Sequence, residues 1–117
     1  MPNLDGRVLG EARELAQSNP NEEVAGLLFS FDELSFYPME NISSDKSFSF
    51  ELDKRVMLLK DRIYAIFHSH PEGDAYPSDW DKGASMALQV PFLIYSLMYD
   101  NFLFFDEGKC NPVQEQG

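Results

Sequence analysis

Apolar residues recur at helical spacing near the start of the chain. Between residues 4 and 17 this spacing predicts one amphipathic helix, which the polar segment Ser18–Asn21 would end. Its apolar members are Leu4, Val8, Leu9, Ala12, Leu15 and Ala16. A continuous apolar run from Val24 to Phe31 predicts a buried strand. After a turn at residues 32–33, the segment Leu34–Met39 predicts its return partner.

The middle of the chain has a less regular pattern. We expect a polar loop over residues 41–47, a short strand at Phe48–Phe50 and a helix that Asp53 caps. From Ile63 to Phe67 a second apolar run leads directly into residues 68–70, and it predicts another buried strand.

The last third of the chain returns to regular elements. A loop rich in proline, glycine and aspartate precedes Ser78, which would begin a helix that reaches about Leu88. Residues 92–99 and 102–105 predict a hairpin that turns at Asp100–Asn101. The polar segment from Asp106 onwards is expected to be loose.

This order of elements predicts a fold class. Because helices and strands alternate, we expect an α/β fold in which helices flank a single mixed sheet. The 117 residues suit one domain. We place that domain at residues 1–105 and a polar C-terminal tail at residues 106–117.

The charge balance argues against nucleic acid as a partner. Nine lysine and arginine residues stand against 20 aspartate and glutamate residues, which gives a net charge of −11. Such a chain repels phosphate backbones. The acidity is spread over both halves, so an acidic solvated surface explains it, and attraction of basic segments in a protein substrate is a second option.

The sequence also carries signals about compartment. The first residues lack the basic and apolar segments of a secretory signal, and no run of about 18 apolar residues could span a membrane. Cys110 is the single cysteine, so no intramolecular disulfide can form, and we interpret it as an ordinary free thiol. We therefore expect a cytoplasmic protein with no membrane partner.

His68 and His70 are the two histidines of the chain, and they stand at the end of the second apolar run. Side chains two positions apart in a strand point to the same side, so both imidazoles can reach one ion. Zinc favours imidazole nitrogen, and three protein ligands with one water are the pattern of a catalytic zinc site. Two polar residues at a strand end would show the same spacing.

Three carboxylates downstream could supply the third ligand, namely Asp74, Asp79 and Asp81. Asp81 stands three residues after Ser78, and Ser-x-x-Asp before an apolar helical run is typical of a capping box. A capped helix would aim Asp81 rigidly, as a metal ligand requires, so the two roles are compatible. The spacing alone does not exclude Asp74 or Asp79.

Hydrolysis assisted by a metal also needs a general base and a donor to the oxyanion. Glu22 and Glu23 precede the first buried strand. Strand alternation puts them on opposite sides, so only one could serve, and the pattern does not choose between them. Both could equally be solvated residues outside the strand. Ser78 is a candidate oxyanion donor, although an N-cap role explains it as well.

Together these residues resemble the signature of a known family. Residues 68–71, 77–78 and 81 form His-x-His-Pro-(x5)-Pro-Ser-x-x-Asp. This is similar to the motif of the JAMM (MPN+) zinc metalloproteases, in their small prokaryotic or phage stand-alone type. Upstream, Glu23 stands three residues before a glycine, as a glutamate does in that family. The resemblance covers roughly residues 8–100.

The resemblance implies an MPN or cytidine-deaminase-like fold and a role for each motif residue. His68, His70 and Asp81 would bind one Zn2+ with a water, Glu23 would be the general base, and Ser78 would donate to the oxyanion. Members of the family hydrolyse peptide or isopeptide bonds beside the C-terminus of ubiquitin or a ubiquitin-like protein. Bacterial and phage relatives act on sulfur-carrier proteins or accompany tail assembly.

Details of the match favour a minimal member of the family. Many members have cysteine where this chain has Ala25, a position that we expect to pack rather than react. The loop Glu72–Tyr76 is of minimal length, and the short chain leaves little room for the segments with which eukaryotic deubiquitinases grip ubiquitin. The stretch Glu40–Ser43, followed by two phenylalanines, is similar to the phage tail-assembly branch.

Two alternatives to a zinc peptidase or isopeptidase stay open. A non-catalytic MPN scaffold or binding module would need neither Glu23 nor Asp81. A different zinc hydrolase, such as a deaminase, would want paired cysteine ligands, which Cys110 alone cannot supply. We expect a protein or peptide substrate, with a ubiquitin-like protein as one option, and we allow for a homodimer.

Overall fold

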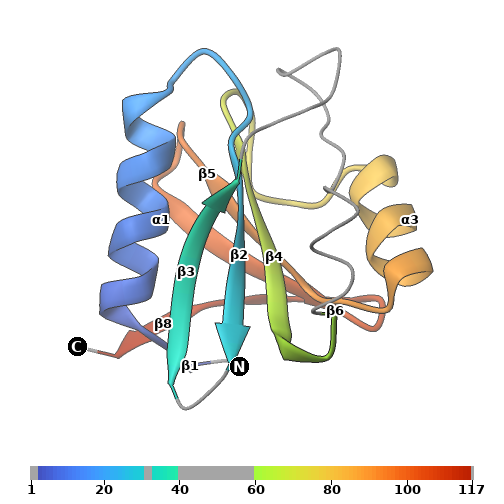
Figure 1. The fold of residues 1–117 in the computed structure, drawn as a ribbon. Helices are drawn as coiled ribbons and strands as arrows, with labels where there is room; N and C mark the ends of the chain where they lie inside the picture. Colours follow the sequence, from blue (N-terminus) through green and yellow to red (C-terminus); the bar gives the residue numbers. More distant parts are fainter. Residues whose placement is uncertain (1–2, 31–32, 40–59, 117) are drawn as a thin grey trace.

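The computed structural model describes residues 3–30, 33–39 and 60–116. Within these residues a six-stranded mixed sheet carries one helix on each face (Figure 1). This arrangement confirms the predicted α/β class. The loop, strand and helix expected between residues 41 and 59 lie outside the described residues, as does residue 32 of the expected turn.

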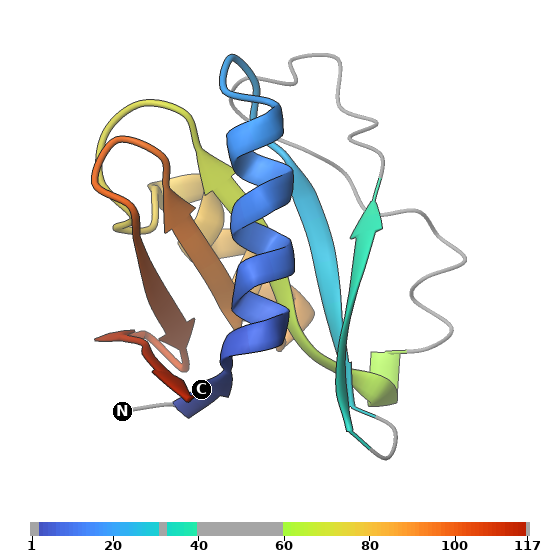
Figure 2. The same ribbon diagram turned by 90° about the vertical axis from the view of Figure 1, so that its left-hand side faces the viewer.

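Helix α1 spans Gly6–Ser18 and packs on one face of the sheet, in front of the strands in Figure 2. It begins two residues later than predicted, because Leu4 belongs to a short strand, β1 (Asn3–Asp5). Asp5 caps the helix, since its side chain accepts a hydrogen bond from the Arg7 N–H at 2.8 Å. No helix among the described residues is long and apolar enough to cross a membrane.

The main sheet has the strand order β3-β2-β4-β5-β6-β7. Its strands are β2 (Ala25–Ser30), β3 (Leu34–Met39), β4 (Ile63–His70), β5 (Phe92–Ser96), β6 (Asn101–Asp106) and β7 (Lys109–Pro112). A short 3-10 helix, Lys60–Arg62, leads into β4. Neighbours are antiparallel except β4 and β5, which are parallel. A parallel pair needs a crossover connection, and helix α3 (Asp79–Leu88) provides it.

Alternation along the strands builds a hydrophobic core on each face of the sheet. Ala65 and Phe67 of β4 point to the face that α1 covers, whereas Ile66 points to the face of α3. Complete burial of a side chain such as Phe67 contributes roughly 1.5–3 kcal/mol. By the same alternation His68 and His70 share the face of Ile66, so both imidazoles lie on the side from which α3 approaches.

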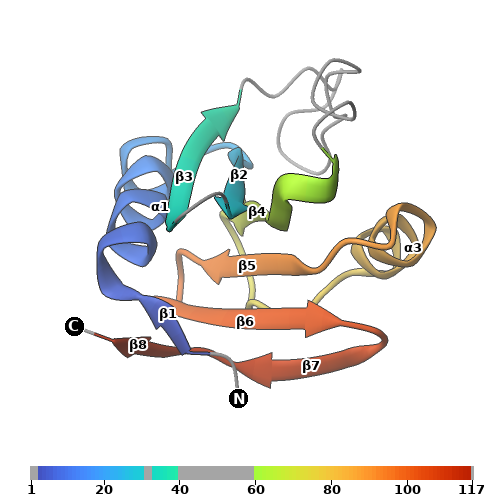
Figure 3. The same ribbon diagram turned by 60° about the horizontal axis from the view of Figure 1, so that its bottom comes forward.

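The last strands correct two predictions. Strands β5 and β6 form the predicted hairpin, but its turn lies at residues 97–100, because Asn101 already pairs with Ser96. The prediction of a loose segment after Asp106 was wrong, since β7 pairs with β6 and β8 (Gln114–Gln116) pairs with β1 (Figure 3). Strand pairing uses backbone hydrogen bonds that every residue type except proline can donate, so polarity alone did not indicate disorder. The domain limits remain a prediction.

Cys110 lies in β7 and is half-buried against the core on the α3 face. It is a free thiol, as predicted. Burial raises the pKa of this thiol, which keeps it protonated and unreactive at neutral pH.

Candidate metal centre

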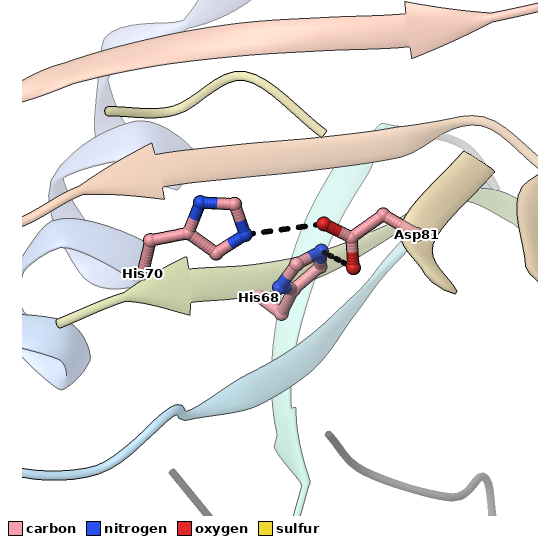
Figure 4. A group of neighbouring side chains, drawn as sticks. All are labelled: His68, His70 and Asp81. Carbon is pink, nitrogen blue, oxygen red and sulfur yellow. Dashed lines mark hydrogen bonds and ion pairs between the residues drawn. The ribbon is translucent and has the colours of Figure 1, made fainter. Parts of the chain in front are cut away.

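The two histidines and one aspartate converge beside the end of β4. His68 Nε2 lies 3.0 Å from Oδ1 of Asp81, and His70 Nε2 lies 3.1 Å from Oδ2 of the same carboxylate. Figure 4 shows both rings directed at Asp81, which projects from the first turn of α3. One ligand atom from each of the three residues lies within 4.8 Å of the others.

These donors fit a zinc ion. In a tetrahedral site with ligand distances of roughly 2.0–2.1 Å, neighbouring ligand atoms are about 3.3 Å apart. Each histidine nitrogen lies near a different oxygen of Asp81, at 3.0 and 3.1 Å, and one ligand atom from each residue lies within 4.8 Å of the others, so small side-chain shifts would bring the three to that spacing. Two imidazoles with one carboxylate are a donor set of catalytic rather than structural zinc sites, and His68 and Asp81 are buried.

The structure distinguishes Asp81 from the other two candidate ligands, Asp74 and Asp79. The side chain of Asp79 is exposed in the first turn of α3. Asp74 is exposed too, and its carboxylate accepts a hydrogen bond from the Tyr76 N–H at 3.0 Å. Among the described residues, Asp81 is the carboxylate that joins the two histidines in a cluster suited to a metal.

The predicted capping box at the start of α3 is present. The Ser78 hydroxyl accepts a hydrogen bond from the Asp81 N–H at 3.1 Å, and the Asp81 carboxylate accepts one from the Ser78 N–H at 2.8 Å. The helix thus begins at its cap with Asp81 fixed by a backbone donor. The capping role and the aim toward the histidines coexist in one residue, as the sequence indicated.

The second ring nitrogen of each histidine also has a neighbour. His70 Nδ1 lies 2.8 Å from the backbone oxygen of Asp74. A carbonyl oxygen can only accept, so Nδ1 carries a proton, and Nε2, on the side of Asp81, is the nitrogen available to a metal. His68 Nδ1 lies 3.0 Å from Oε1 of Glu23. A carboxylate in this position favours a proton on Nδ1 as well.

Glu23 rather than Glu22 lies at the centre. Glu23 is 3% exposed, whereas Glu22 is half-exposed. The chain is held here by Ser69, whose hydroxyl accepts a hydrogen bond from the Val24 N–H at 3.0 Å and whose own N–H donates to the Val24 oxygen at 3.0 Å. In an extended segment Glu23 and Ala25 point to the same side, and Ala25 is the strand partner of His68. Glu23 is therefore on the side of His68.

Charges in the centre shift two pKa values in opposite directions. Burial alone would lower the pKa of His68, but the carboxylates of Asp81 and Glu23, each 3.0 Å from a ring nitrogen, outweigh it and raise that pKa to about 9. For Asp81, burial raises the pKa, and the hydrogen bonds to His68 and His70 outweigh it, so the pKa falls far below its usual range. Asp81 is therefore ionised throughout the neutral range, as a metal ligand must be.

Comparison with known proteins decides the family. Residues 6–102 match the model of the prokaryotic homologues of the JAB domain. The chain belongs to this JAB (JAMM/MPN) family. The matched range contains Glu23, His68, His70, Ser78 and Asp81, and the small prokaryotic type predicted from the motif is confirmed.

Individual relatives agree with the family assignment. A protein from Haloferax volcanii named desampylase is 31% identical over 87 residues, which are 64% of this chain and 63% of that protein. The chain thus spans less than two thirds of the length of this curated relative.

Solved structures give the same fold. A protein of Desulfitobacterium hafniense matches with a TM-score of 0.67 and 26% identity over 99% of this chain and 92% of its own. A JAB1/MPN domain protein from Archaeoglobus fulgidus matches with a TM-score of 0.69 and 19% identity over 100% of both chains. A structure described as a metalloprotease-like zinc site in the proteasome and signalosome matches with a TM-score of 0.61 and 19% identity, over 100% of this chain and 98% of its own.

In this JAB-family protein a cleft of about 490 Å³ gives access to the centre. Glu23, His70 and Ser78 line it, so the candidate base, one candidate ligand and the candidate oxyanion donor face the same space. The remaining walls come from the loops before β2 and after β4, with Pro20, Asn21, Pro71, Glu72, Gly73, Asp74 and Tyr76.

Sequence reasoning missed two contacts that orient the centre. Ser69 was passed over as the unspecified residue between two histidines, although a serine in an apolar strand is a signal, since a buried hydroxyl needs a partner. The Asp74 carbonyl had no signal at all, because the contact comes from the backbone. Asp74 was weighed only for its side chain.

Proposed function

We propose that this protein is a zinc-dependent isopeptidase or peptidase. The observation that carries the proposal is the position of Glu23. Its carboxylate is buried 3.0 Å from His68 and also lines the cleft that His70 enters. A scaffold would need no buried carboxylate beside a cluster suited to a metal, because an isolated buried charge is costly.

His68, His70 and Asp81 would hold the metal through two imidazole nitrogens and one carboxylate oxygen. A zinc ion bound there would supply Lewis acidity, lowering the pKa of a water ligand and polarising the scissile carbonyl. The Asp74 carbonyl and the Glu23 carboxylate would keep the two imidazoles in the tautomer that presents Nε2.

Two side chains of the cleft would handle protons and charge. Glu23 would accept a proton from the attacking water at its carboxylate and later deliver a proton to the leaving amine. The Ser78 hydroxyl accepts from the Asp81 N–H, so its own proton is left to donate to the oxygen of the tetrahedral intermediate. Both groups are set before substrate arrives, because a strand entry and a helix cap position them.

The substrate we propose is a peptide or isopeptide bond next to the C-terminus of a ubiquitin-like protein. The similarity to a desampylase supports isopeptide chemistry, although it covers 63% of that protein. The cleft is open to the surface and has a loop of minimal length, which suits an extended tail. We infer a cytoplasmic setting from the sequence, and phage tail assembly remains a second option that rests on residues outside the described ranges.

The test measures metal content and hydrolysis on the same preparation. The protein should bind one zinc ion per chain and hydrolyse a fluorogenic amide of a ubiquitin-like C-terminal peptide, or a lysine isopeptide of it, and a chelator should stop the reaction. Glu23→Gln should keep zinc but lose turnover by roughly 100-fold or more.

Two results would count against the proposal. A chain that takes up no zinc at neutral pH after reconstitution has no metal centre. A chain that binds zinc, hydrolyses none of these substrates and keeps its cellular role as Glu23→Gln is a scaffold or binding module of the same fold.

A further inference from the structure

Ser96 is a buried serine beside the metal centre. It is the last residue of β5, it has no exposed surface, and it is the parallel partner of His70 in β4. Strand alternation puts its side chain on the face of His68 and His70. The motif did not include it, and the roles proposed above do not use it.

The hydroxyl of Ser96 joins two segments of backbone. It donates a hydrogen bond to the Gly73 oxygen at 2.7 Å and accepts one from the Tyr99 N–H at 3.1 Å. Gly73 belongs to the loop that follows β4, and Tyr99 belongs to the turn between β5 and β6. The Leu97 N–H also donates to the His70 oxygen at 3.1 Å. The loop and the turn are therefore fastened together at this point.

The loop that Ser96 holds is the one that orients His70. The oxygen of Asp74, the residue directly after Gly73, lies 2.8 Å from His70 Nδ1. Gly73 has a φ of +83°, a conformation that glycine adopts without strain. A glycine leaves the adjacent peptide groups of a loop free to rotate. The hydrogen bond from Ser96 fixes the Gly73 carbonyl, which is next to the Asp74 carbonyl that His70 contacts.

The turn that carries Tyr99 is itself anchored to α1. Tyr95 donates its hydroxyl proton to Asp100 at 2.6 Å, and Arg13 of α1 forms an ion pair with the same carboxylate at 3.0 Å. Ser96 thus connects the loop to a turn that is held from the opposite side of the sheet.

We propose that Ser96 is a positioning residue for the metal centre. Through Gly73 it holds the Asp74 carbonyl against His70 Nδ1, which keeps a proton on Nδ1 and turns Nε2 to the side of Asp81. The consequence for catalysis rests on the proposed function, whereas the effect on the His70 tautomer does not.

The decisive measurement is the tautomer of His70 in the metal-free protein, read from imidazole nitrogen resonances at alkaline pH. The chain has two histidines, so two sets of ring signals must be assigned. The wild type should show His70 with its proton on Nδ1. Ser96→Ala should shift a measurable fraction to the Nε2–H form. It should also weaken zinc binding, by less than the roughly 10- to 100-fold loss that follows removal of a ligand's own hydrogen-bond partner, because Ser96 acts on the adjacent carbonyl.

Ser85 offers a matched control. It is 5% exposed, and its hydroxyl donates to a backbone oxygen, that of Val90, at the same 2.7 Å. Ser85→Ala should lower the melting temperature much as Ser96→Ala does but leave the tautomer and the zinc affinity unchanged. If Ser96→Ala behaves like this control in all three measurements, Ser96 has only a structural role and the proposal is wrong.

Ser96→Cys keeps the test decisive if the alanine variant does not fold. A thiol is a weaker donor of similar size, so this variant should give an intermediate tautomer fraction and an intermediate zinc affinity. An unchanged His70 tautomer in Ser96→Cys with zinc affinity equal to wild type would overturn the proposal. If the wild type binds zinc and shows the expected His70 tautomer but hydrolyses none of the substrates, only the proposed function is wrong.

Discussion

Oε1 of Glu23 lies 3.0 Å from Nδ1 of His68, and the other nitrogen of this ring lies 3.0 Å from Asp81. The imidazole has no exposed surface and lies between two carboxylates, one from the segment before β2 and one from α3. That environment favours the charged ring, whereas a metal ligand must have a free lone pair. Protons and a zinc ion bound at this centre would therefore compete for His68.

This competition predicts opposite pH effects on the stability of the metal-free protein and on its affinity for zinc. The pKa of His68 is raised from 6.5 to about 9 in the folded metal-free chain. The resulting stability is fully present below pH 6.5 and is lost as the pH rises through about 9. Zinc displaces this proton, so zinc affinity should rise by up to tenfold per pH unit over the same range.

Melting temperatures measured from pH 6.5 to 9, with and without zinc, check this prediction. The metal-free protein should lose stability across the range while the increase caused by zinc grows. Asp81 contributes no slope there, because its depressed pKa keeps it ionised. A zinc-induced shift that stays constant with pH would show that His68 gives up no proton on binding.

Ser69→Ala should uncouple Glu23 from the metal ligands. The substitution removes the hydroxyl that accepts from the Val24 N–H, and a buried donor left without a partner costs about 1–3 kcal/mol. Because Val24 follows Glu23 directly, we expect turnover to fall more than zinc affinity. Urea unfolding, zinc titration and hydrolysis rates measure the three effects. Ser85→Ala is the control, and equal turnover in the two variants would contradict the prediction.

Much of the fold follows from periodicity because the strongest elements are the most apolar. The runs at Val24–Phe31 and Ile63–Phe67 became β2 and β4 at the centre of the sheet, and Ser78 capped its helix as predicted. The polar edge was harder to predict. Strand β8 is held to β1 by backbone hydrogen bonds between chain ends, and no side-chain pattern marks a pairing so distant in sequence.

The centre was predictable where side-chain chemistry sets it. The spacing of His68 and His70 required one face of a strand, and that face is the one Asp81 approaches. The choice of Glu23 over Glu22 came from the family pattern. The sequence alone does not tell which of the two faces the histidines, because that depends on how β2 is aligned with β4. The carbonyl of Asp74 was beyond prediction, because backbone acceptors are the same at every residue.

Gly26→Ala should destabilise the sheet beside the centre. A Cβ at this position would lie 2.5 Å from the Phe36 ring and 3.1 Å from the Tyr37 oxygen, and overpacking of this kind costs about 1–3 kcal/mol. Gly10→Ala is the matched control. Gly10 lies in α1 with nothing near its added carbon, so it should gain roughly 0.5–1 kcal/mol. Denaturant unfolding distinguishes the two, and equal changes would contradict the packing argument.

Asp81→Asn should separate the metal-binding role of Asp81 from its role in the capping box. The amide keeps an oxygen that can accept from the Ser78 N–H, as the carboxylate does at 2.8 Å, so α3 should stay capped. The melting temperature of the metal-free protein should still fall, because the charge that pairs with the histidines is lost. The variant also loses the negative charge that zinc requires, and zinc affinity should fall by more than about 100-fold.

Asp79→Asn, two residues earlier on the same helix, should leave zinc binding unchanged. Zinc titration of both variants checks this. If the Asp79 variant were the weaker binder, the ligand set drawn from the geometry would be wrong, whereas equal affinity in both would place the third ligand elsewhere in the chain.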